Sequence, residues 1–85
     1  MFIHLGGDTL VNSKEVIGIF DLESTTVSKK TRDFLKIAEN KKEVINVTYE
    51  LPKTFIVCSN KNKKRKIYIS QLSSSTLLKR TNINF

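Results

Sequence analysis

The sequence predicts an α+β fold, a small, mostly antiparallel sheet with one longer helix at about residues 26–40 and a short C-terminal helix at about residues 74–81. Short runs rich in β-branched and aromatic residues occur in both halves of the chain, and such runs are typical of strands. One central segment instead places its apolar residues at helical spacing. Short connections favour antiparallel pairing, so we expect a single six-stranded sheet with the helices on one face.

We expect the chain to form one domain, residues 1–85. A domain this short buries only about 60–65% of the surface that its unfolded chain exposes, and such domains often gain stability from disulfides, metals or oligomerisation. One cysteine and one histidine exclude an intrachain disulfide and are too few for a typical four-ligand zinc site. We therefore expect no cofactor and a homo-oligomer, a ring or a dimer, that covers the unpaired sheet edges.

The N-terminal part is predicted to begin with a hairpin. Short extended runs lie on either side of Gly6-Gly7-Asp8, where glycine permits the positive φ of a tight turn. Residues 16–20 follow as a run of β-branched and aromatic residues and are predicted to form a buried strand. Gly18 within this run indicates a bulge or a close backbone approach.

The long helix is predicted from apolar positions spaced at i, i+4, i+7, i+8 and i+11, which lie on one helix face. These positions are Val27, Thr31, Phe34, Leu35 and Ala38. Residues 24–26, Ser-Thr-Thr, offer N-cap candidates, and Asn40 is the expected C-cap.

Three further strands are predicted around residues 44–47, 55–58 and 67–69. Residues 49–52 are predicted to form a turn, because proline cannot occupy a central strand. The polar segment 59–66 is expected to be a flexible loop. Ser73 to Thr76 can cap the C-terminal helix, and the tail from residue 82 is expected to fray.

Catalytic chemistry finds little support, and we expect no enzymatic activity. The eight carboxylates are scattered, and none is paired in a way that suggests shared titration. His4 has no evident partner to orient it as a base, and Cys58 ends an apolar strand, where an inert buried thiol is expected. Gly6 and Gly7 lack the residues that complete a phosphate-binding loop.

Positive charge is the strongest feature of the composition. Fifteen Lys and Arg against eight Asp and Glu give a net charge of +7. Such a charge attracts nucleic acid or another polyanion, although lysines also keep small proteins soluble. Five cations crowd into six residues, 61–66, where we expect a hairpin tip. The alternative is a solvated loop that discourages aggregation at the sheet edge.

We predict that these cations bind the phosphate backbone of duplex DNA without reading bases, since no base-reading motif is present. The predicted DNA-binding residues are Lys61, Lys63, Lys64, Arg65, Lys66, Lys53, Lys79 and Arg80.

The chain is expected to be cytoplasmic, without a membrane partner. No run approaches the about 20 apolar residues of a membrane-spanning helix. The first residues lack the basic and long apolar regions of a signal peptide. A single free cysteine fits a reducing compartment.

Three segments resemble the RemA/RemB family of bacterial extracellular-matrix regulators, in its RemB-like branch. They are MFIHLG at residues 1–6, VIGIFD at residues 16–21 and YISQLSSSTLLKR at residues 68–80. The resemblance covers essentially the whole chain. It implies a DNA-binding regulator of transcription of biofilm-matrix genes, built of small α+β subunits that assemble into rings around which DNA can wrap.

The chain departs from the RemA-like pattern where that pattern places its DNA contacts. RemA-like chains carry two arginines after a segment that matches Val47-Thr48-Tyr49, and Leu51-Pro52 stands there in this chain. Glu15 stands where another arginine is expected. Two functions therefore stay open, a DNA-binding oligomeric regulator that uses residues 61–66, and an oligomeric protein-interaction module that has lost DNA binding.

Overall fold

The computed structural model describes residues 1–22 and 28–81. The N-cap candidates at residues 24–26, the predicted start of the long helix near residue 26, Val27 and the tail from residue 82 lie outside the described residues.

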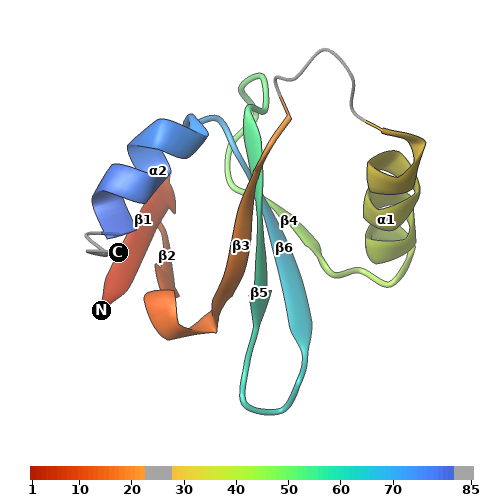
Figure 1. The fold of residues 1–85 in the computed structure, drawn as a ribbon, viewed down its shortest axis with the longest axis horizontal. Coiled ribbons are helices and arrows are strands. Elements are labelled where there is room, and N and C mark those ends of the chain that lie inside the picture. The colour runs from red at the N-terminus through yellow and green to blue at the C-terminus, as the bar shows by residue number, and fades with distance from the viewer. Residues whose placement is uncertain (23–27, 82–85) are drawn as a thin grey trace.

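Along the described chain, three strands precede the first α-helix and three more precede the second, as the sequence predicts, and the fold is α+β (Figure 1). The elements are β1 (Phe2–Gly6), β2 (Thr9–Asn12), the 3₁₀ helix η1 (Ser13–Glu15), β3 (Val16–Asp21), α1 (Lys29–Asn40), β4 (Val44–Asn46), β5 (Thr54–Ser59), β6 (Arg65–Ser70) and α2 (Ser74–Thr81).

The strands form two sheets, so the expected single six-stranded sheet is wrong. β1 and β2 pair as the predicted hairpin, with Gly6 and Gly7 at φ of 111° and 52° in its turn. The other strands form a four-stranded sheet in the order β3-β5-β6-β4. Its β3-β5 and β5-β6 pairs are antiparallel, and β4 runs parallel to β6. The larger sheet is thus mostly antiparallel, as predicted.

The two helices lie on opposite sides of the four-stranded sheet, which corrects the expectation that both cover one face (Figure 1). The cause is β5, whose residues are apolar on both of its faces. Ile56 and Cys58 pack into a core with the β1-β2 hairpin and Leu77 of α2. Phe55 and Val57 pack into a second core with α1. A strand that is apolar on both faces requires a cover on each.

β3 is an edge strand, whereas the sequence predicted a buried one. Its residues Ile17 and Phe20 are 66% and 45% exposed. The pairing with β5 shifts register between Val16 and Gly18, which confirms the bulge. The Phe20 ring lies over Gly18, where a Cβ would come within 2.7 Å of it, so the close approach is also confirmed.

α1 packs through the predicted face, since Phe34, Leu35 and Ala38 belong to the second core. Its N-cap is Ser28, whose hydroxyl accepts a hydrogen bond from the backbone N–H of Thr31. The C-cap is Lys41 rather than the predicted Asn40, which remains helical. Lys42 then takes a φ of 59° and turns the chain into β4.

Ser70 joins the two sheets. Its buried hydroxyl donates to the backbone carbonyl of Leu5 in β1 at 2.7 Å and accepts from the N–H of Leu72 at 3.0 Å. Both partners would lose a hydrogen bond if the hydroxyl were removed. This contact and the shared apolar core hold the β1-β2 hairpin and α2 against the larger sheet.

Candidate nucleic-acid interface

The basic run 61–66 spans the tip of the β5-β6 hairpin and the first residues of β6, as predicted. The tip is internally bonded rather than loose. The side-chain oxygen of Asn60 accepts from the backbone N–H groups of Asn62 and Lys64, at 2.9 and 3.0 Å. Its backbone oxygen accepts from Lys63, which takes a φ of 60°. Hydrogen bonds therefore hold the backbone that carries the lysine side chains.

Arg65 differs from its basic neighbours because it is anchored. Its guanidinium donates to the Glu43 carboxylate at 3.2 Å and lies 5.1 Å from the centre of the Phe34 ring. The side chains of Arg65 and Glu43 are 35% and 21% exposed. Lys61, Lys63, Lys64 and Lys66 are exposed. The arginine thus links α1, the start of β4 and the hairpin, whereas the lysines face solvent.

The hairpin shares a groove of about 450 Å³ with the turn between α1 and β4. This basic groove is lined by Lys42, Glu43, Ile45, Lys63, Lys64, Arg65 and Lys66. The parallel pairing of β4 with β6 creates it, and the backbone N–H of Ile67 donates to the carbonyl of Glu43 at 2.9 Å. Lys42 is not among the residues predicted from the sequence to bind DNA, because only the parallel pairing brings it to the hairpin.

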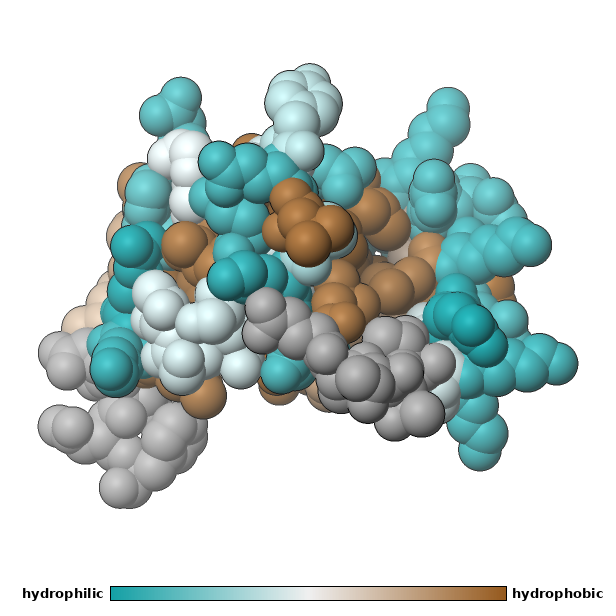
Figure 2. All heavy atoms as spheres, turned by 90° about the horizontal axis from the view of Figure 1, so that it is seen from above, coloured by the Kyte–Doolittle hydropathy of each residue, from teal (hydrophilic) through white to brown (hydrophobic). Residues whose placement is uncertain are grey.

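The other predicted DNA-binding residues lie elsewhere. Lys53 precedes β5, at the end of the strand opposite the hairpin tip, and six strand residues span about 17 Å. That end of the molecule is seen in Figure 2, where hydrophobic side chains are exposed over the sheet. Lys79 and Arg80 are exposed in the last turn of α2, which packs beside β1. The structure therefore brings together residues 61–66 but separates the remaining three.

Arg80 and His4 lie within hydrogen-bond distance of each other and of the backbone of the β1-β2 hairpin. The His4 Nε2 lies 2.6 Å from the carbonyl oxygen of Gly7, so this nitrogen is the donor and Nδ1 is free to accept. One Arg80 nitrogen lies 3.2 Å from that Nδ1 and donates to the His4 carbonyl at 3.2 Å. These contacts tie the end of α2 to β1.

Cys58 and Tyr68 lie close to Glu15, beside the hairpin but on the face away from α1. Burial, followed by the nearby Glu15 carboxylate, raises the pKa of the Cys58 thiol to about 11. Burial also raises the pKa of Tyr68, with smaller contributions from Cys58 and Glu15. A buried thiol with a high pKa is a poor nucleophile, because the thiolate is the reactive form.

We predict that Cys58 does not react with Ellman's reagent at pH 8 in the native protein and reacts fully in urea. Its folded pKa lies above the unfolded value of 9.0, so burial of the neutral thiol stabilises the fold fully below pH 9. That contribution is lost as the pH rises through 9 to about 11. Rapid labelling of the native protein would show that the thiol is accessible, contrary to its 4% exposure.

Within residues 1–22 and 28–81, no cluster of three or more His, Cys, Asp and Glu side chains is placed to hold a metal ion. In the same part of the chain, no helix has the length and apolar character needed to cross a membrane.

The fold and the groove together define a class, that of small basic α+β proteins with clustered cations on one surface. Comparison with known proteins places the chain more narrowly. The profile of the RemA-like family, described as extracellular matrix regulatory protein A-like, matches residues 2–81. The chain is 38% identical over 85 residues to extracellular matrix regulatory protein B of Bacillus subtilis (strain 168), covering 100% of this chain and 95% of that relative. The chain belongs to the RemA-like family of extracellular matrix regulatory proteins, which confirms the resemblance.

Proposed function

We propose that this chain is a DNA-binding regulator of transcription in the bacterial cytoplasm that acts on extracellular-matrix genes as a homo-oligomer. It binds the phosphate backbone of duplex DNA and carries out no catalysis. The relationship to extracellular matrix regulatory protein B supports the regulatory role. The net charge of +7 supports a polyanionic partner.

The basic groove is the observation that carries the proposal. Lys42 from the α1-β4 turn and four cations from the hairpin surround it, and Glu43 is the acidic residue in its lining. Arg65 is already paired with Glu43, so the positive field comes mainly from the lysines. Exposed lysines on a hydrogen-bonded hairpin suit phosphate oxygens spaced along a duplex, and they read no base edges.

The salt dependence of binding tests the proposal. In an electrophoretic shift with a duplex of arbitrary sequence, the logarithm of the binding constant should fall linearly with the logarithm of salt concentration. Five phosphate contacts on one copy predict a slope of about −4.5, because each contact releases about 0.9 counterion. A scrambled duplex of equal length should bind about as well. Absence of a shift at 50 mM salt, or a shift that salt does not weaken, would refute backbone binding.

The alternative is an oligomeric protein-interaction module that has lost DNA binding. Leu51 and Pro52 favour it, because they stand where the RemA-like pattern has its arginine pair and Leu51 is 83% exposed. Recovery of one stable protein partner in a pulldown, together with no DNA shift at low salt, would support this alternative. A DNA shift with the predicted slope would reject it.

A further inference from the structure

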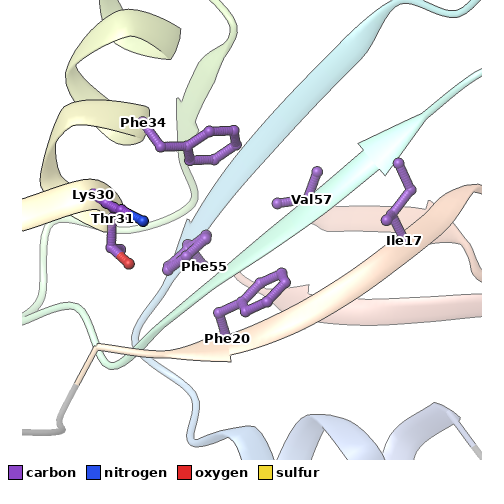
Figure 3. A pocket seen from close by; sticks show the side chains of 7 residues that line it. All are labelled: Ile17, Phe20, Lys30, Thr31, Phe34, Phe55 and Val57. Atoms are coloured by element: carbon purple, nitrogen blue, oxygen red, sulfur yellow. The ribbon is translucent and has the colours of Figure 1, made fainter. Parts of the chain in front are cut away.

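An apolar hollow of about 350 Å³ lies between the start of α1 and the edge of the four-stranded sheet (Figure 3). Ile17 and Phe20 of β3, Phe55 and Val57 of β5, and Phe34 of α1 line it, and Lys30 stands at its rim. The Phe20 and Phe55 rings stack with their centres 4.9 Å apart. α1 packs against the other half of this face, through Val44 and Ile69. Within residues 1–22 and 28–81, no helix or strand covers the β3 half.

The loop between β4 and β5 carries apolar side chains that project from the molecule. Tyr49 is 107% exposed and Leu51 is 83% exposed, so neither side chain packs on its own fold. The loop has a defined turn, since the N–H of Glu50 donates to the Thr48 hydroxyl at 3.1 Å. The ring of Pro52, two residues further on, fixes the φ of that residue. Two apolar side chains thus flank one carboxylate on a projecting turn.

The hollow and the loop lie on different parts of the same sheet. The strand order β3-β5-β6-β4 places β3 at one edge, and the hollow lies on the α1 side of that edge. The loop leaves β4 at the other edge and crosses to β5, so it lies at the end of the sheet away from the β5-β6 hairpin tip, where the Lys53 carbonyl accepts from the N–H of Leu22. Features that complement each other across a molecule bind head to tail between identical copies, and such contacts repeat into a ring or a filament.

The charges of the two surfaces also match. Glu50 projects with the loop, and Lys30 stands at the rim of the hollow. Among residues 1–22 and 28–81, neither side chain has an ion-pair partner. Apolar contact between loop and hollow would bring the carboxylate beside the ammonium group, which fixes the orientation of the contact.

We propose that the Tyr49–Leu51 loop of one copy inserts into the hollow of the next copy, with Glu50 against Lys30. The occupant is a second copy of this chain because both halves of the contact are present in one sequence. The inference rests on the proposed homo-oligomer and names its contact surfaces. Neither surface includes a residue of the basic groove, so assembly and DNA binding can be tested separately.

A mixing experiment tests the head-to-tail contact. Ile17→Glu places a carboxylate in the hollow, opposite the incoming Glu50, and leaves the loop intact. Leu51→Lys places a cation on the loop, facing Lys30, and leaves the hollow intact. Both positions are exposed, so circular dichroism should show an unchanged fold. By light scattering at equal concentrations, the unsubstituted protein should be larger than a dimer and each variant should be a 9.7 kDa monomer.

An equimolar mixture of the two variants should form a dimer and nothing larger, because only one intact loop and one intact hollow remain per pair. Assembly of either variant alone to the unsubstituted size would overturn the named surfaces and leave the oligomer standing. Monomeric variants that fail to pair would overturn them as well. A monomeric unsubstituted protein would refute both the proposed contact and the proposed homo-oligomer. The electrophoretic shift would then test DNA binding by the monomer.

Charge reversal provides a second test that leaves the apolar contact in place. Glu50→Lys should raise the dissociation constant between copies by about 10-fold, by setting two ammonium groups together. Lys30→Glu in the same chain should restore most of the affinity, because it rebuilds the ion pair in reverse. Equal effects of the single and double substitutions would show that these residues do not meet.

Discussion

Replacing Lys63, Lys64 and Lys66 together by glutamine is expected to weaken duplex DNA binding on the order of 100-fold at physiological salt. These lysines are exposed and line the basic groove. Each phosphate contact that is lost no longer releases a counterion, so the slope of log binding constant against log salt should become shallower by about 3. Electrophoretic shift or fluorescence anisotropy over a salt series measures both quantities.

Arg65 is left unchanged in this variant because it has a structural role. Removing its guanidinium would leave the half-buried Glu43 carboxylate without its partner and would disturb the fold together with the charge. Its loss would therefore not isolate the contribution of charge to binding.

A matched control removes the same charge elsewhere. Lys14, Lys29 and Lys36 are exposed and lie outside the groove lining, and their replacement by glutamine should lower affinity only a few-fold. If both triple variants bind equally well, the net charge and not the groove governs binding. If neither variant binds less tightly than the unsubstituted chain, the site lies on another surface.

The strands and helices could be predicted from the sequence because their patterns are local. The Gly6-Gly7 turn, the bulge at Gly18 and the apolar face of α1 each depend on residues within one element. The predicted layer arrangement, with both helices on one face of a single sheet, was wrong, although β5 contained the necessary information. The run from Phe55 to Cys58 is apolar without alternation, which indicates a strand buried on both faces.

The candidate site was predictable only in its continuous part. The run 61–66 is visible as sequence, whereas Lys42 reaches the groove through the parallel pairing of β4 and β6. The anchoring of Arg65 on Glu43 and Phe34 joins residues from separate elements, and no spacing in the sequence indicates it. Long-range pairing decides which lysines act together and which arginine is structural.

Ile67→Ala is expected to lower the free energy of unfolding by about 2–5 kcal/mol. Ile67 is fully buried in β6 and packs with Ala38, Phe55 and Val57 beneath α1. Truncation leaves a cavity where α1 meets the sheet. For a chain of this length the total stability is on the order of 4–13 kcal/mol, so the loss is a large share of it. Urea unfolding followed by circular dichroism measures the change at fixed protein concentration.

Ile37→Ala is the matched control, because it removes the same atoms from a side chain that is 52% exposed on α1. Alanine is the best helix former, so this change should alter stability by less than about 1 kcal/mol. Similar losses in the two variants would contradict the packing of α1 on β6. That packing also holds Lys42 beside the hairpin, since the chain passes from α1 through Lys42 into β4. Loosening it should therefore weaken DNA binding even at temperatures where Ile67→Ala remains folded, whereas Ile37→Ala should bind as the unsubstituted chain does.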